Sequence, residues 1–538
     1  MIPIEARYRK AALALSGLLL AGGLLLVQPG CRRGAAPAPA LKHVILFIGD
    51  GMSAASEVAA SRYLTGRNDG LAWQGFPAKA SVATWDVNVY NAHARRAKRP
   101  PFSPSSFTPA LGYDARSGDD DPASGPGAGP RPPRGPATDS ASAATALATG
   151  LKTDSGNIAW LPGDPPGGGL TTIAEEFRAR AGASIGVVTT VPFDHATPAA
   201  FVSHNTGRSG YYTGIKGSKG MGLADEIIER TKPEVVIGGG SPLLDNPGFD
   251  TKKGYISESL YRELRESREY LLVERRPGQD GGRALLEGAA AAARDGRKLF
   301  GLFGGKGGNF EAPQAEDTPG RPTIRPGSDE DPSLAEAAEA ALVRLAADPE
   351  GFFLVVEQGD IDWANHDNDF RAMIGSVADL DQAVRAALAF VDKPGDDIDW
   401  TNTVLLVTAD HATGGLALDP EKPLGLGDLP RQEARVEKKE AVSPKPGPDR
   451  GVASNGAVPK KPGFVSPNIY PDGEVSYATA GHTNDLVDLA VKGAAVPVFM
   501  ALRGTLYPGP VLDNTQINAA LREALGLGPL GREPRPAH

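Results

Sequence analysis

Three runs of apolar residues, each of strand length, lead directly into a carboxylate. They are HVILFIG before Asp50, FFLVV before Glu357 and VLLVTA before Asp410. Continuous runs rich in β-branched residues are typical of strands buried on both faces of a mostly parallel sheet. Ligands of such sheets bind beyond the carboxyl ends of the strands. Each acid alone is most simply a turn or capping residue, but three together favour a functional site at one edge of the sheet.

Strand and helix patterns alternate along the rest of the chain. Further strands are expected at 185–189, 235–238 and 299–303, and helices at 257–265, 284–294, 333–347, 370–391 and 514–525. This alternation predicts an α/β fold, a doubly wound α/β/α sandwich with a large, mostly parallel central sheet. Residues 98–137, rich in Pro, Gly, Ser and Asp, and residues 420–475, rich in Lys, Glu, Pro and Gly, interrupt the pattern and are expected to be surface insertions.

The composition excludes some classes of protein. The net charge of −9 makes a nucleic-acid binder improbable. A single cysteine rules out a disulfide framework and a Cys-rich zinc site.

The N-terminus has the layout of an export signal. Basic residues precede the apolar run 11–27, which is short for a membrane span and ends just before Cys31. We therefore expect a signal peptide over 1–30 and a tether over 31–40. The position of Cys31 resembles that in bacterial lipoproteins, where the cysteine becomes the lipid anchor, although Gln28 departs from the usual signal. Secretion without lipid and an uncleaved anchor are the alternatives. Each places the protein outside the cytoplasm, in the periplasm, on a membrane or in the medium.

Histidines accompany the carboxylates. Asp362 and His366 are four residues apart, so a helix would present both on one face, and His411 directly follows Asp410. His482 lies in the loop sequence GHT. Imidazole and carboxylate ligands suit Zn²⁺, and oxygen ligands alone suit Mg²⁺. A surface ion pair is the alternative for Asp362 and His366.

A nucleophile and an anion clamp can also be suggested. Ser140 opens an Ala-rich helix in the run TDSASAATA, with Thr138 or Asp139 as its cap, and a helix N-terminus favours an anion. Arg208, eleven residues after Thr197, is able to fork onto phosphate oxygens. The simpler alternatives are a helix-capping serine and a surface arginine.

Taken together, the motifs resemble those of the alkaline phosphatase family. They are GDGM at 49–52, TDSASAATA at 138–146, HATPAA at 195–200 with Arg208, EQGDIDWANH at 357–366, TADHATGG at 408–415 and GHT at 481–483. They occur in the family's order with its internal spacings. The resemblance implies one catalytic domain over 41–538. Residues 420–475 then take the place of the family's variable crown region.

The resemblance implies hydrolysis of phosphate monoesters through a phosphoserine intermediate, with two Zn²⁺ and one Mg²⁺. Ser140 would be the nucleophile and Arg208 the phosphate clamp. The implied metal ligands are Asp362, His366 and His482 for the first zinc, Asp50, Asp410 and His411 for the second, and Asp50, Thr197 and Glu357 for magnesium. His195 and Trp363 would lie beside the third site, where the best-known bacterial form has Asp and Lys, so Mg²⁺ and Zn²⁺ both stay open there.

The implied partners are small phosphomonoester substrates, inorganic phosphate as product and a second copy of the chain in a homodimer. The implied role is phosphate scavenging outside the cytoplasm. The 98–137 insertion would either cover the site or project from it.

Two other functions compete with this interpretation. A phosphodiesterase, sulfatase or phosphomutase of the same superfamily shares the two-metal core, but the sulfatase nucleophile motif is absent, and Thr197, Glu357 and Arg208 favour monoesters. A lipoprotein that binds metal or phosphate without turnover is disfavoured, because no expected ligand or nucleophile is missing.

Overall fold

The computed structural model describes residues 41–113, 137–209, 221–243, 249, 255–305, 307–434 and 466–530. The expected signal peptide and tether, with Cys31, lie outside these residues, as do 114–136 and 435–465 of the two expected insertions. Among the helices of the described ranges, none combines the length and apolar character that a membrane crossing requires.

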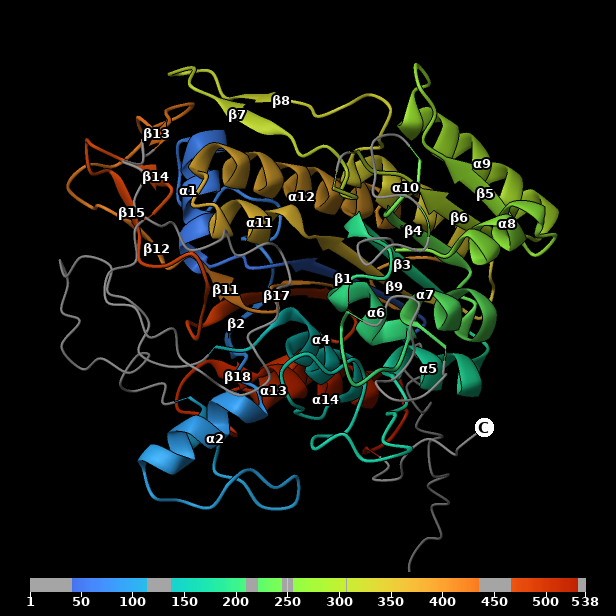
Figure 1. Cartoon of the computed structure of the whole chain (residues 1–538), viewed down its shortest axis with the longest axis horizontal. Helices are drawn as coiled ribbons and strands as arrows, with labels where there is room; N and C mark the ends of the chain where they lie inside the picture. Colours follow the sequence, from blue (N-terminus) through green and yellow to red (C-terminus); the bar gives the residue numbers. More distant parts are fainter. Residues whose placement is uncertain are drawn as a thin grey trace, which may run out of the picture. The chain divides into compact units, whose positions relative to one another are not determined.

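A ten-stranded sheet forms the centre of the domain (Figure 1). Its strands are, in spatial order, β18 (Val511–Asp513), β2 (Ala78–Ala83), β17 (Val487–Gly493), β10 (Thr403–Thr408), β1 (His43–Gly49), β9 (Phe352–Gln358), β3 (Ser184–Pro192), β4 (Val235–Gly239), β6 (Lys298–Leu302) and β5 (Tyr270–Glu274). Every pairing is parallel except those of β17 with β10 and β2. The expected large, mostly parallel sheet is therefore confirmed.

Helices cover both faces of the sheet (Figure 1). One layer contains α1 (Ala54–Thr65), α9 (Gly281–Asp295), α10 (Leu334–Leu345), α11 (Asp360–His366) and α12 (Phe370–Val391). The other contains α4 (Ser140–Thr149), α5 (Ile173–Ala181), α6 (Ala196–Val202), α13 (Val496–Leu502) and α14 (Asn514–Ala524). Shorter or peripheral elements are α2 (Val87–Arg96), α3 (Pro109–Gly112), α7 (Leu223–Asp225), the π-helix η1 (Glu226–Thr231) and α8 (Glu258–Glu266). This is the α/β/α sandwich expected from the alternation of patterns.

The central strands and the helix starts explain why this chain adopts the fold. All seven residues of β1 and all seven of β9 are buried, which matches the apolar runs 44–48 and 352–356 within them. Helix α10 begins with a capping box between Ser333 and Glu336, and the Asp369 side chain caps α12. Four strands of the central sheet, β2, β5, β17 and β18, were not expected. Polar residues interrupt β2 and β17 at Lys79 and Asp488, which hides their strand character.

The described part of the first insertion packs on aromatic residues that precede it in the chain. After α2, Phe102 and Phe107 contact the rings of Trp85 and Tyr90. Residues 95–101 are exposed. Short antiparallel pairs lie outside the main sheet, namely β7 (Gln314–Glu316) with β8 (Thr323–Arg325), β11 (Ala412–Thr413) with β16 (His482–Thr483), β12 (Leu416–Leu418) with β15 (Val475–Tyr477) and β13 (Glu433–Ala434) with β14 (Asn468–Ile469).

Candidate active site

The three carboxylates expected at strand ends meet at one edge of the sheet. Strand β1 lies between β9 and β10, and Ile48 is in register with both Glu357 and Thr408. Asp50 therefore follows β1 beside the ends of the two strands that deliver Glu357 and Asp410. The next residue, Gly51, lies directly against Asp362, which only a glycine allows. It has a φ of 68°, and a Cβ there would lie 2.6 Å from Asp362 Oδ1.

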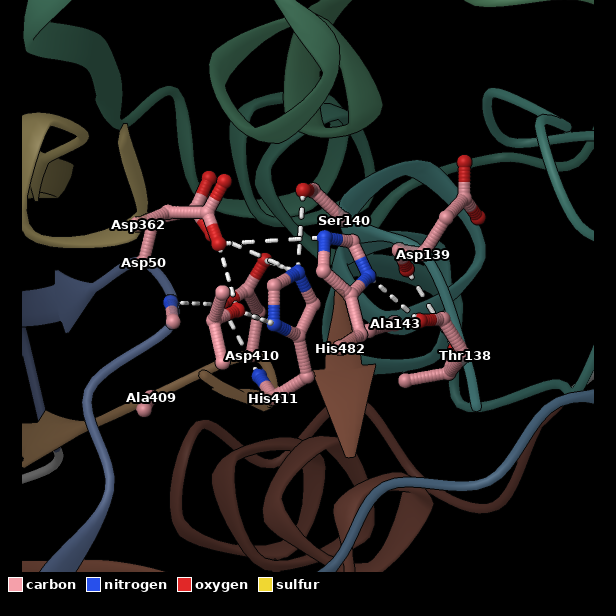
Figure 2. A network of polar contacts seen from close by, with 12 residues as sticks. Asp50, Thr138, Asp139, Ser140, Ala143, Asp362, Ala409, Asp410, His411 and His482 are labelled. Carbon is pink, nitrogen blue, oxygen red and sulfur yellow. Dashed lines mark hydrogen bonds and ion pairs between the residues drawn. The ribbon is translucent and has the colours of Figure 1, made fainter. Parts of the chain in front are cut away.

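His411 lies at the centre of the cluster (Figure 2). Its Nε2 is 3.3 Å from Asp50 Oδ1, 3.4 Å from Asp410 Oδ2 and 3.1 Å from Ser140 Oγ. Ser140 is the first residue of α4, and Asp139 caps that helix by accepting from the Ser142 amide. The candidate nucleophile thus touches the carboxylate and histidine cluster directly.

A second group lies against the first. His366 Nε2 is 3.1 Å from Asp362 Oδ2, and His482 Nε2 is 3.7 Å from Asp362 Oδ1. The two Nε2 atoms of His366 and His482 are themselves 3.1 Å apart. The ring of His482 stacks on that of His411 with centroids 3.7 Å apart. The six side chains that share this cluster are Asp50, Asp362, His366, Asp410, His411 and His482.

The hydrogen bonds on the far sides of the rings fix the tautomers. His366 Nδ1 contacts the Ala480 carbonyl and His482 Nδ1 contacts the Thr138 carbonyl, and a carbonyl only accepts. Thr413 Oγ1 gives its proton to Asp362, so its contact with His411 Nδ1 must be one in which the ring donates. All three Nε2 atoms therefore present lone pairs to one another and to carboxylates. Such an arrangement of acceptors fits divalent cations held between them.

The charges in the cluster lead to the same conclusion. Burial, and repulsion from Asp410, Asp362 and Glu357, raise the pKa of Asp50 well above its usual range. Burial lowers the pKa of His411 to about 4, so that imidazole is neutral near neutral pH. Asp50 Oδ1 and Asp410 Oδ2 are buried and accept no hydrogen bond. The site therefore carries more negative charge than its own residues compensate.

The residues expected at the third metal site lie next to this cluster. Glu357 is fully buried and accepts a hydrogen bond from Thr189 at 2.5 Å. Thr197 is buried in the first turn of α6, and His195 is the residue before that helix. The rings of His195 and Trp363 are 6.4 Å apart.

Arg208 lies on the nucleophile's side of the site. Its Nη1 is 3.1 Å from Asp139 Oδ2, and its backbone amide donates to the Gly156 carbonyl. Asp139 is the residue directly before Ser140, so this ion pair places the guanidinium close to the start of α4. Figure 2 shows the Asp139 carboxylate pointing away from the histidine cluster.

Three supporting residues were not expected from the sequence as site residues. Thr413 orients Asp362 and His411, Thr189 holds Glu357, and Asp139 holds Arg208. Thr413 lies inside the TADHATGG motif, which is the only sequence signal for it. Nothing in the sequence marks Thr189, because its contact depends on the register between β3 and β9.

Comparison with known proteins agrees with the motifs. The family model for alkaline phosphatase matches residues 131–500, and the chain belongs to this family. Alkaline phosphatase 3 of Bacillus subtilis (strain 168) is 31% identical over 290 residues, which cover 54% of this chain and 52% of that protein. Alkaline phosphatase of Escherichia coli (strain K12) is 32% identical over 308 residues, covering 53% and 60%. The chain thus spans about half the length of such relatives.

Other similarities extend over more of the chain. Streptomycin-6-phosphate phosphatase of Streptomyces griseus is 29% identical over 425 residues, 72% of this chain and 78% of that protein. The crystal structure of Thermus thermophilus alkaline phosphatase matches with a TM-score of 0.55 at 21% identity, covering 94% and 96%. The enzyme from the Antarctic bacterium TAB5 matches with a TM-score of 0.53 at 18% identity, covering 91% and 100%. At these identities the two structures support the fold.

Proposed function

We propose that the protein hydrolyses phosphate monoesters to an alcohol and inorganic phosphate, with Ser140 as the nucleophile. The observation that carries this proposal is the position of Ser140 Oγ, 3.1 Å from His411 Nε2 at the border of a buried cluster of acceptors. Serine at the start of a helix, beside a site that needs cations and beside an anchored arginine, suits attack on a phosphorus atom.

Metal ions belong to this proposal. The first zinc would be held by Asp362, His366 and His482, the second by Asp50, Asp410 and His411, and the magnesium by Asp50, Thr197 and Glu357. Two cations in such a site stabilise the attacking and leaving oxygens of an in-line displacement, and a third neutralises further charge. Mutants of the TAB5 alkaline phosphatase in which a histidine is replaced by Asp or Glu are known with Mg bound in the M3 site. We keep Mg²⁺ as the proposed third ion here.

The chain's own residues divide the remaining work. Ser140 Oγ attacks phosphorus and gives its hydroxyl proton to solvent. The bond from phosphorus to the leaving oxygen breaks, and that oxygen takes up a proton from solvent, which gives phosphoserine and the free alcohol. Water then attacks phosphorus from the opposite side, so inorganic phosphate departs and Ser140 Oγ regains a proton. Arg208 binds the phosphate oxygens, and its ion pair with Asp139 fixes the plane of the guanidinium. Two in-line steps give net retention at phosphorus.

The cellular setting is part of the same proposal. The basic and apolar N-terminus supports export, and Cys31 supports a lipid anchor in the periplasm or on a membrane. Outside the cytoplasm, the reaction would release phosphate from small monoesters for uptake. A homodimer follows from family membership as a further proposal.

Turnover of p-nitrophenyl phosphate tests the function. Protein purified with Zn²⁺ and Mg²⁺ should turn over the monoester in alkaline solution, and Ser140→Ala should lose this activity. Ser155→Ala, in the loop after α4, is a matched control that should keep it. A higher rate on bis-p-nitrophenyl phosphate than on the monoester would instead support a diesterase. Metal-loaded protein that binds phosphate without hydrolysing either ester would support a binding protein.

A further inference from the structure

A second carboxylate, Asp86 at the start of α2, reaches the first turn of the nucleophile helix. Asp86 caps α2, where its Oδ1 accepts from the Val89 amide at 2.8 Å. Its other oxygen, Oδ2, lies 3.2 Å from the hydroxyl of Ser142, two residues after the nucleophile. Both Asp86 and Ser142 are almost completely buried. The contact therefore joins α2 to the first turn of α4 without solvent between them.

The Ser142 hydroxyl has one proton and more than one acceptor. Asp139 Oδ1 lies at 2.7 Å, Asp86 Oδ2 and the Asp139 carbonyl each lie at 3.2 Å, and Thr138 Oγ1 lies at 2.9 Å. A hydroxyl donates a single hydrogen bond. When that bond goes to Asp86, Asp139 loses one of its donors.

The number of donors on Asp139 affects Arg208. Asp139 Oδ1 also accepts from the amides of Ser142 and Gly156, each at 3.0 Å, while Oδ2 pairs with Arg208 Nη1. Each added donor spreads the negative charge of a carboxylate and weakens its attraction for a cation. Asp139 with fewer donors therefore holds Arg208 more strongly and neutralises more of its charge.

We propose that Asp86 is a positioning residue that competes with Asp139 for the Ser142 proton, and so sets how strongly Arg208 binds phosphate. The proposal rests on the proposed function, because it takes Arg208 to be the phosphate clamp. Asp86 does not touch the substrate; it acts through Ser142 and Asp139.

The charges around Asp86 are consistent with this competition. Asp139 faces it from the start of α4, and Lys152 faces it from the segment after α4. Lys152 is itself paired with Asp513 at 3.1 Å. Burial is the main cause that raises the pKa of Asp86 to about 7. In alkaline solution Asp86 is therefore ionised and able to accept the Ser142 proton.

Calorimetric titration of the metal-loaded protein with inorganic phosphate tests the proposal. Asp86→Asn keeps an oxygen to cap α2 but presents an amide donor to Ser142, which then donates to Asp139. We expect the Kd for phosphate to fall about three- to tenfold. Ser142→Ala removes a donor from Asp139, so the Kd should rise by a similar factor. In the Ser142→Ala background, Asp86→Asn should change the Kd little.

The control is Asp280→Asn, which replaces another helix-capping aspartate that accepts from the amide of its third following residue. It should leave the Kd unchanged. Equal Kd values for Asp86→Asn and the wild type would overturn the proposal, as would additive effects in the double variant. Wild-type protein that binds phosphate but does not hydrolyse p-nitrophenyl phosphate would refute the proposed function alone, because the Kd comparison would still test Asp86.

Discussion

Two clusters of charged and polar side chains in this protein are built in opposite ways. Near the end of β5, the Arg275 guanidinium contacts three carboxylates, Glu311 at 2.8 Å, Glu330 at 3.1 Å and Asp331 at 3.0 Å. Asp331 accepts further hydrogen bonds from the amides of Gly304 and Glu311. In the candidate active site, by contrast, carboxylates and unprotonated imidazole nitrogens face each other. The Arg275 cluster contains its own cation, and the active-site cluster lacks one.

This difference in charge balance gives the two clusters different roles, one in the stability of the fold and one in the binding of ions. A buried ion pair within the chain is complete as soon as the chain folds, and removing one partner leaves buried charge behind. A cluster of acceptors is unfavourable in the folded chain until cations bind, and that unfavourable free energy gives the site its affinity for them. The Arg275 cluster therefore stabilises the fold by itself. The active-site cluster is instead suited to bind cations.

Removing one carboxylate from the active-site cluster should have the largest effect. Asp50→Asn should lower kcat/KM for p-nitrophenyl phosphate about a thousandfold, because Asp50 is shared by two proposed metal sites. In the presence of a chelator, the same variant should be at least as stable as the wild type, since it relieves the repulsion that raises the pKa of Asp50. Steady-state kinetics and urea unfolding measure the two effects. A metal-free variant less stable than the metal-free wild type would show that the cluster is not strained.

The second-largest effect is expected when a chelator removes metal ions, because only the active-site cluster should lose stability. Ions present at 1,000 times their Kd contribute about 4 kcal/mol each to the free energy of unfolding. Adding a chelator should therefore lower the stability of the wild type by several kcal/mol. Asp50→Asn should lose less, because it binds its ions more weakly. An unchanged melting temperature after chelation would contradict the metal sites.

The opposite pattern is expected for the Arg275 cluster. Arg275→Met should lower the free energy of unfolding by about 3–5 kcal/mol, because the buried Asp331 loses its cation. The kcat of the folded variant at 25 °C should equal that of the wild type, and a chelator should cause the same further loss of stability in both. A large fall in kcat would mean that the two clusters are coupled.

A smaller effect, which depends on pH, is expected for the contribution of His204 to the free energy of unfolding. His204 is buried between Glu226, 3.0 Å from Nδ1, and Glu175, 3.3 Å from Nε2. Burial opposes its charge, but the two carboxylates raise its pKa to about 9. This folded-state pKa is above the unfolded value, so the stabilisation is complete below pH 6.5 and is lost as pH rises through about 9.

Melting temperatures of the wild type and of His204→Gln between pH 6 and pH 10 test this effect. We expect the wild type to lose up to roughly 3 kcal/mol relative to the variant over this range. A constant difference between the two proteins across the range would show that His204 does not titrate there.

The sequence predicted those parts of the molecule that depend on local pattern. The buried runs before Asp50, Glu357 and Asp410 form adjacent strands, and this alone brings the acids together. The expectation that one helix carries Asp362 and His366 is also confirmed, since both lie on α11. These features follow from the periods of strands and helices and require no knowledge of distant contacts.

Other parts depend on contacts that no local pattern records. Asp86 lies just before a stretch that is irregular in composition. Its approach to α4 depends on contacts with the segment after that helix, where the Val87 amide donates to the Thr153 carbonyl and Lys152 donates to the Trp85 carbonyl. Strand β17 runs antiparallel to its neighbours, which no strand-and-helix alternation predicts. The partners of Thr413 were equally hidden, because the hydroxyl of this residue in β11 meets Asp362 and His411 only in the finished fold.

The wide separation of the site residues along the chain has a consequence for biosynthesis. Ser140 and His411 are 271 residues apart, and Thr138 and His482 are 344 apart. Contacts of such long range slow folding, because the entropy of closing long loops opposes them. A growing chain therefore lacks the complete set of candidate ligands until His482 has been made. Assembly of this cluster, and any binding of cations by it, therefore follows synthesis of nearly the whole chain.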